Sequence, residues 1–314
     1  MKRSYLNLAM GVLVLALGAG VYFSQNKSAP PKSPLTALKP ARIDRIEIDH
    51  PGTKPVVLER HGAQWRLTQP IQADADSYEV NGVLDLATAP IRRNLESSPV
   101  KRSNLGLEPP QYSVKFNDVT IKVGGIEPLR YQRYVEVGKR IALVDNPSSG
   151  ALGKNYAELV SKRLLPAGVQ IDKIELPGVT VARSADGKGW QISPPVERVA
   201  ADAAQQLVDH WSEATALWTK LADDTDESRK APGNPQYVTV TLQSGAPIRF
   251  LIAGHLPQLV LERQDIGIRY ALGKDQADTL LRLATAKPAT PASSAKPAAA
   301  TGETGNAKAV AGKP

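Results

Sequence analysis

Short apolar runs separated by turn signals fill the first half of this chain after residue 40. Apolar residues at close or alternate spacing predict strands over residues 43–48, 56–58, 65–67, 114–116, 119–123, 134–137 and 141–144. Residues 80–87 instead repeat apolar side chains at helical spacing, with Asp76 as the expected N-cap and Pro90 as the expected stop. A second, short helix is expected over residues 148–159.

The second half repeats this order of elements. Strands are expected over residues 171–176, 179–182, 190–192, 238–242, 248–252, 259–261 and 268–272. Asp202 should cap a helix whose apolar stripe runs through Trp211 to Trp218, and residues 275–283 should close the fold as a short helix. Runs of strands with helices between and after them predict an α+β class with mostly antiparallel pairing.

Sequence motifs also recur about 125 residues apart. Residues 43–48 (IDRIEI) return as 171–176 (IDKIEL), 65–70 (WRLTQP) as 190–195 (WQISPP), and 110–112 (PQY) as 235–237 (PQY). We therefore predict two tandem, similar modules, residues 41–167 and 168–284, each with one long and one short helix.

The N-terminal segment has the pattern of a membrane anchor. Lys2 and Arg3 precede an uncharged stretch over residues 4–26, which at 1.5 Å per residue is long enough to cross hydrocarbon. We expect a single transmembrane helix over about residues 6–23, within an anchor of residues 1–27, in a bacterial inner membrane. The basic pair should stay cytoplasmic and leave the bulk of the chain in the periplasm. A cleaved signal peptide, with small residues at 16 and 18, is the alternative.

Composition defines the remaining parts. Residues 28–40 form a spacer rich in Pro, Ser and Lys, and residues 285–314 form a tail of Ala, Pro and Lys that we expect to be disordered. The chain has no Cys, which excludes disulfides, thiol catalysis, Cys-ligated zinc and a lipoprotein anchor. The net charge of +8 comes mostly from the two ends, so we expect no nucleic-acid partner.

The search for chemistry finds only weak candidates. The four histidines have no partner at helical spacing, and the acidic run 223–227 lacks the glycine and terminal Glu of a calcium loop. Asp74 and Asp76 resemble the paired carboxylates of a hydrolase, although capping of the next helix is the simpler role for them. We predict no catalytic, cofactor-binding or metal-binding residues, and a protein that is not an enzyme.

Four tryptophans are the remaining candidates. Trp65 and Trp190 each follow a turn and precede a proline, so they are either core residues or contacts for a ligand or partner. Trp211 and Trp218 lie seven residues apart on the predicted helical stripe, which indicates contacts in the core or between modules.

Residues 62–70 (Gly-x-x-Trp-x-Leu-x-x-Pro), Ala73-Asp74 before a helix, and residues 105–110 (LGLEPP) carry a resemblance. The pattern resembles a bacterial domain-of-unknown-function family over about residues 40–285, with a weaker match in the second copy. The family's members occur as membrane-anchored proteins, and also fused or adjacent to uncharacterised ABC-type transport and gliding-motility auxiliary components. The resemblance has no catalytic residues to carry over and implies an envelope role.

The predicted function is therefore that of a non-enzymatic accessory protein. We expect an inner-membrane protein that presents two periplasmic modules to envelope partners, among them subunits of an ABC transporter. The alternative is a periplasmic module that binds glycan, peptidoglycan or lipid in a groove between the two modules.

Overall fold

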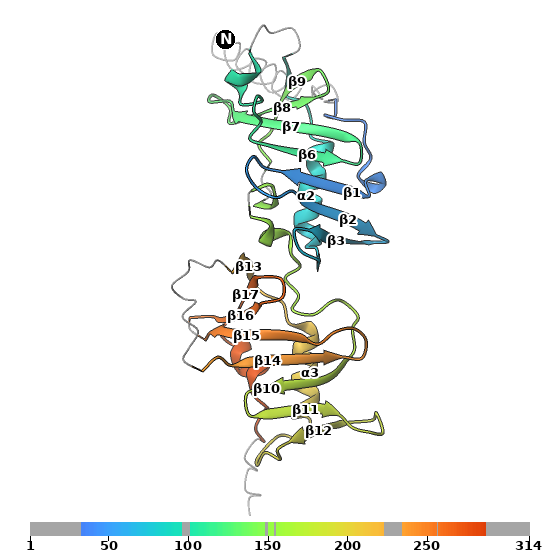
Figure 1. Ribbon diagram of the computed structural model, residues 1–314, viewed down its shortest axis with the longest axis vertical. Helices are drawn as coiled ribbons and strands as arrows, with labels where there is room; N and C mark the ends of the chain where they lie inside the picture. Colours follow the sequence, from blue (N-terminus) through green and yellow to red (C-terminus); the bar gives the residue numbers. More distant parts are fainter. Residues whose placement is uncertain are drawn as a thin grey trace, which may run out of the picture.

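The computed structural model describes residues 33–95, 101–147, 150–153, 155–222, 234–255 and 257–286. These residues form mostly antiparallel strands in two sheets with few helices, which confirms the predicted α+β character. The two sheets follow one another along the long axis of the molecule (Figure 1).

The first sheet has nine strands in the order β4-β3-β2-β1-β6-β7-β8-β9-β5. Their bounds are β1 Arg45–Asp49, β2 Val56–His61, β3 Gln64–Gln69, β4 Ala73–Asp74, β5 Arg93–Asn94, β6 Tyr112–Phe116, β7 Val119–Ile126, β8 Arg133–Val137 and β9 Arg140–Val144. The helices of this half are η1 Pro40–Arg42, α2 Ser77–Ala87, η2 Arg102–Leu105, η3 Gly150–Leu152 and η4 Tyr156–Leu159.

The second sheet has eight strands in the order β12-β11-β10-β14-β15-β16-β17-β13. Their bounds are β10 Ile171–Leu176, β11 Val179–Arg183, β12 Trp190–Ser193, β13 Trp218–Leu221, β14 Tyr237–Leu242, β15 Ile248–Gly254, β16 Leu259–Arg263 and β17 Ile268–Leu272. Its helices are α3 Ala203–Glu213 and α4 Gln276–Leu281.

The two strand orders correspond position by position, apart from β4. β1 pairs with β2 on one side and with β6 on the other. In the same way, β10 pairs with β11 and with β14, and a longer crossover segment precedes β6 and β14 in the chain. In each case the crossover carries a helix, α2 or α3, which lies against one face of its sheet (Figure 1).

Alternating apolar residues form the core as the pattern predicts. Ile46 and Ile48 on β1 are buried, while Arg45 and Asp49 beside them are exposed. In register, Ile46 lies opposite Leu58 on β2 and Phe116 on β6, so three strands contribute to one apolar layer. This is the period-2 pattern of a sheet with one face buried.

Three short edge strands are absent from the sequence prediction. β4 and β5 have two residues each and β13 has four. Each lies at an end of its sheet and pairs with one neighbour. None is long enough for an alternation of apolar residues to predict a strand. Their pairing therefore depends on the adjacent strand rather than on their own sequence.

The long helix of the second half is shorter than predicted. α3 ends at Glu213, and Trp218 begins strand β13 instead of extending the helical stripe. Ala214 has a non-helical backbone, with ψ at 126°, and its carbonyl accepts a hydrogen bond from the Leu164 amide, while the Ala216 amide donates to the Lys162 carbonyl. These bonds to another segment replace the bonds that would continue the helix.

The predicted helix over residues 148–159 is also different, because the chain forms the two 3₁₀ turns η3 and η4 instead. The predicted closing helix over residues 275–283 is present as α4. The end of the predicted spacer packs on the fold: Leu35 is 2 % exposed, and its amide donates to the Ala89 carbonyl at 2.8 Å.

Several sequence predictions lie outside the described residues. These are the anchor of residues 1–27 with its transmembrane helix, the spacer up to residue 32, the acidic run 223–227, and the tail from residue 287. Among the residues that are described, the helices are all too short or too polar to cross a bilayer.

Candidate functional site

The β4 end of the first sheet meets the β13 end of the second through hydrogen bonds to the segment between them. The Asp76 amide donates to the Leu159 carbonyl and the Ser161 amide to the Asp74 carbonyl, both at 2.8 Å. On the other side, the Thr219 hydroxyl donates to the Ala157 carbonyl at 2.8 Å. Residues 157–164 are therefore held by both sheets, so we call the contact region around them the junction.

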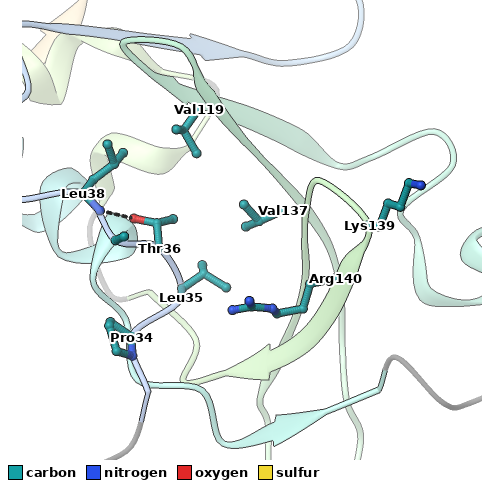
Figure 2. A pocket seen from close by; sticks show the side chains of 9 residues that line it. Pro34, Leu35, Thr36, Leu38, Val119, Val137, Lys139 and Arg140 are labelled. Carbon is teal, nitrogen blue, oxygen red and sulfur yellow. Dashed lines mark hydrogen bonds between the residues drawn. The ribbon is translucent and has the colours of Figure 1, made fainter.

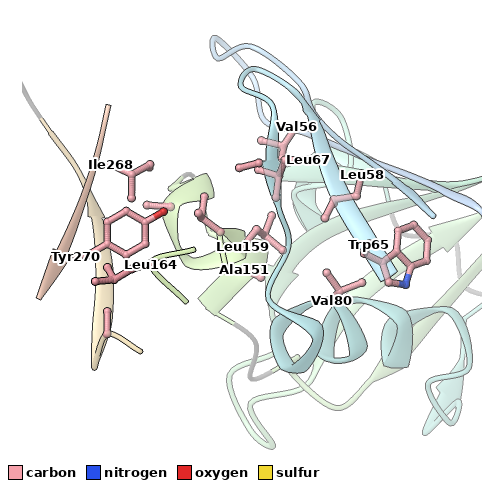
Figure 3. Close-up of a cluster of buried hydrophobic side chains, with 14 of the residues drawn as sticks. Val56, Leu58, Trp65, Leu67, Val80, Ala151, Leu159, Leu164, Ile268 and Tyr270 are labelled. Carbon is pink, nitrogen blue, oxygen red and sulfur yellow. The ribbon is translucent and has the colours of Figure 1, made fainter. Parts of the chain in front are cut away.

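Apolar side chains continue through the junction. Leu159 and Leu164 are each 1 % exposed or less and lie between α2 and β17. Figure 3 shows them between Val80 on helix α2 and Tyr270 on strand β17. Because the buried cluster runs through both halves without a break, the two sheets share one apolar core.

A small polar cavity of about 110 Å³ opens beside this core. Its walls include Arg66, Asp74, Arg263 and Tyr270. Burial raises the pKa of the Tyr270 phenol to about 12, so this group stays neutral at ordinary pH. A cavity of this size holds a few water molecules, whereas sites for small organic ligands usually measure about 300–1,000 Å³.

The two candidate carboxylates lie at the junction. Asp74 forms an ion pair with Arg66, with 3.3 Å between Oδ1 and Nε. Asp76 accepts hydrogen bonds from the amides of Tyr78 and Glu79, which confirms that it caps α2, and it lies 3.8 Å from Lys162 Nζ. Each carboxylate thus has partners that hold the fold together, which favours a structural role for both.

Capping can be tested by comparing the two predicted N-caps. Asp202 precedes α3 but makes no capping bond with its side chain. Asp76→Ala should therefore lower the free energy of unfolding by about 1 kcal/mol or more, and Asp202→Ala by clearly less. Urea unfolding followed by circular dichroism measures both, and equal losses would contradict the assigned role of Asp76.

Large apolar side chains are exposed where the two sheets meet. Leu217 is 58 % exposed, Trp218 42 % and Tyr78 80 %. Leu217 follows Ala216, whose amide is bonded to Lys162, and Lys162 contacts Asp76 two residues before Tyr78. All three side chains therefore come from segments that meet at the junction, and exposed apolar groups of this size are typical of interaction surfaces.

Trp65 and Trp190 occupy matching positions in the two sheets. Trp65 is 6 % exposed and lies opposite Arg60 in the β2–β3 pair, with the guanidinium 4.8 Å from the ring centroid. Trp190 is half-buried and lies opposite Arg183 in the β11–β12 pair, at 4.7 Å. One face of each ring is thus covered by an arginine, which favours a structural role over stacking on a ligand.

The other two tryptophans, Trp211 and Trp218, lie in different environments. Trp211 is fully buried, and its indole Nε1 donates to the Leu280 carbonyl at 2.9 Å. Trp218 lies on the edge strand at the junction. A core or inter-module contact was expected for both residues. Trp211 is a core residue, whereas Trp218 is 42 % exposed on β13.

A cavity of about 670 Å³ lies at the opposite end of the first sheet. Its apolar walls come from the segment around Leu35 and Leu38 and from Val119 and Val137 (Figure 2). Arg140 extends toward Leu35, whereas Lys139 points away from the cavity (Figure 2). Sequence reasoning missed this cavity because residues 34–38 read as a spacer.

These observations define an α+β protein whose two antiparallel sheets share a buried junction. In its described residues, no group of three or more His, Asp and Glu side chains is placed to hold a metal ion. The chain belongs to the family described as Domain of unknown function (DUF4340), whose model matches residues 65–225. Curated proteins and solved structures give no match.

The matched residues have a clear position in the fold. They begin in β3 and end just after β13, and so include α2, residues 157–164 and α3. The family match thus covers segments on both sides of the junction, including the exposed Tyr78, Leu217 and Trp218, but not β14 to β17 of the second sheet.

Proposed function

We propose that this protein is a non-enzymatic, single-pass inner-membrane protein that presents two periplasmic modules as an accessory component of a cell-envelope assembly. The exposed side chains of Tyr78, Leu217 and Trp218, which come from segments that meet at the junction, are the observation that carries this proposal. Hydrogen bonds to residues 157–164 hold these segments together, so they offer a partner an ordered contact.

The two modules are, in this proposal, tandem copies of one unit. The corresponding strand orders support this, as do the matching pairs Arg60–Trp65 and Arg183–Trp190. The anchor is supported by the uncharged stretch over residues 4–26 behind Lys2 and Arg3. The link to an ABC transporter rests on the family resemblance alone.

The alternative of a glycan, peptidoglycan or lipid site between the modules has less support. The cavity at the junction measures about 110 Å³, well below the usual size of sites for such ligands. Arg66 and Asp74 in the wall of this cavity could form hydrogen bonds with a sugar, but they form an ion pair with each other.

Site-specific photocrosslinking in native membranes tests the partner surface. A photoreactive amino acid at Leu217 should give a crosslinked product with a different envelope protein. The same amino acid at Ser244, on an exposed turn of the second sheet, is the matched control. Recovery of the uncrosslinked chain alone from both positions would contradict the proposal.

A further inference from the structure

Charge is divided unevenly along the first sheet. Described residues 91–95 and 119–147, which contain β5, β7, β8 and β9, carry seven Lys or Arg and three Asp or Glu. Residues 43–90, which contain β1 to β4 and α2, carry four Lys or Arg and eight Asp or Glu. The sheet is therefore positive at its β5 end and negative at the end that meets the second sheet.

The acidic side chains at the positive end are buried or paired, so its exposed surface stays positively charged. Glu127 and Glu136 are 7 % and 5 % exposed, and Asp145 forms an ion pair with Arg92. Arg93 on β5 and Lys139 in the β8–β9 turn are both exposed. We call β5, β8, β9 and the loop of residues 127–132 the basic end.

The loop between β7 and β8 adds exposed apolar groups to the basic end. Leu129 is 86 % exposed and Tyr131 74 %, with the exposed Arg130 between them. Glu127 holds the loop in shape: its carboxylate accepts a bond from the Arg130 amide at 2.8 Å, and its amide donates to the Gln132 carbonyl at 2.7 Å. An aliphatic, a basic and an aromatic side chain on one ordered loop match the chemistry of a membrane interface.

The chain also enters the fold at this end. The segment after residue 33 lies beside β7, β8 and β9, where it forms one wall of the large cavity. Only residues 27–33 separate it from the uncharged stretch 4–26, and seven residues span at most about 25 Å. An anchor in that stretch therefore brings the basic end, rather than the second sheet, close to the bilayer.

The charges of the second half of the fold favour the same orientation. Residues 168–284 carry 12 Lys or Arg and 15 Asp or Glu. An anionic surface would attract the basic end and repel both the acidic half of the first sheet and the second sheet. Attraction of the basic end and repulsion of the rest of the two sheets would tilt the long axis of the molecule away from the membrane plane.

We propose that the basic end docks on the anionic phospholipids of the adjacent leaflet and sets the molecule upright on the membrane. The inference rests on the membrane anchor of the proposed function. Arg93, Arg130 and Lys139 contact lipid headgroups, while Leu129 and Tyr131 enter the headgroup region. Each cation near an anionic surface favours the docked state by about five-fold. Cations on a sheet edge also prevent edge-to-edge pairing, but that role alone predicts no dependence on lipid charge.

The absence of cysteine from the chain makes the test direct. A single cysteine at the exposed Pro128 carries a fluorophore, and full-length protein is reconstituted into vesicles that contain a lipid-borne quencher. The vesicles are phosphatidylcholine alone or phosphatidylcholine with phosphatidylglycerol. The matched label is at Ser244, and the matched charge variants are Arg93→Glu/Lys139→Glu and, in the second sheet, Lys188→Glu/Lys274→Glu.

Quenching at position 128 should rise with phosphatidylglycerol and fall again at 1 M salt, where screening is nearly complete over about 3 Å. The Arg93/Lys139 variant should lower the ratio of docked to undocked molecules by on the order of 25-fold or more. The Lys188/Lys274 variant and the label at Ser244 should show no change. Thermal unfolding of both variants checks that they are folded.

Equal quenching at position 128 in neutral and anionic vesicles, with the protein retained in the membrane after alkaline washing, would overturn this inference alone. Release of the protein by alkaline washing would instead refute the anchor, and with it the proposed function. Capture of an acidic envelope protein by a crosslinker at position 128, without any response to lipid charge, would replace the bilayer by a protein partner.

Discussion

Replacing Trp211 by alanine should lower the free energy of unfolding by about 4 kcal/mol. The indole is fully buried on α3, its ring lies 5.4 Å from that of Phe250, and its Nε1 donates to the Leu280 carbonyl. The substitution opens a large cavity and leaves that carbonyl without its donor. Urea unfolding of the full-length chain in mild detergent, followed by circular dichroism, measures the loss.

Trp218→Ala is the matched control for this prediction. Trp218 is the same residue type seven positions later and is 42 % exposed. Its replacement should cost no more than about 1 kcal/mol, because surface substitutions usually have small effects. Similar losses for both variants would contradict the assignment of Trp211 to the core. Trp218→Ala should instead reduce crosslinking from the junction surface.

Replacing Gly124 by alanine should destabilise the fold by about 3 kcal/mol. A Cβ atom at Gly124 would lie 2.3 Å from the Leu105 carbonyl oxygen and 3.0 Å from Leu107 Cγ. The first of these contacts is with backbone, so relief requires η2 to move away from β7. Arg102 of η2 forms an ion pair with Glu136 on β8 at 2.8 Å, which limits this movement.

Gly125→Ala is the neighbouring control. A Cβ atom at Gly125 would lie 3.5 Å from the same Leu105 oxygen, an ordinary van der Waals distance. Its replacement should cost less than about 1 kcal/mol. Thermal unfolding of the two variants side by side measures the difference, and a larger loss for Gly125→Ala would refute the close packing of η2 on β7.

Strands with a clear alternation could be predicted from sequence because burial of one face imposes a period of two. β1, with Ile46 and Ile48 inward, and β14, with Val238, Val240 and Leu242 inward, are examples. The hairpin turn at Asn117 was predictable for a local reason. Its φ is +49°, a conformation that asparagine adopts more readily than most residues.

The candidate site was much less accessible to sequence reasoning. Asp76 was correctly predicted as an N-cap, since capping depends on residues close in sequence. The junction depends on contacts between residues far apart, such as Thr219 with Ala157 and Ala216 with Lys162. No local pattern marks these pairs, so Leu217 and Trp218 could not be recognised as exposed residues between two sheets.

Sequence by itself determined the α+β class, the succession of most strands, the cap of α2 and the recurrence of motifs in the two halves. All of these depend on periodicity and on side chains within a few residues of one another. Only the tertiary structure decided where α3 ends, which strands close the sheet edges, and that residues 34–38 pack on the first sheet. Those outcomes depend on which distant backbone groups offer hydrogen bonds and which apolar surfaces remain to be covered, and neither is set locally.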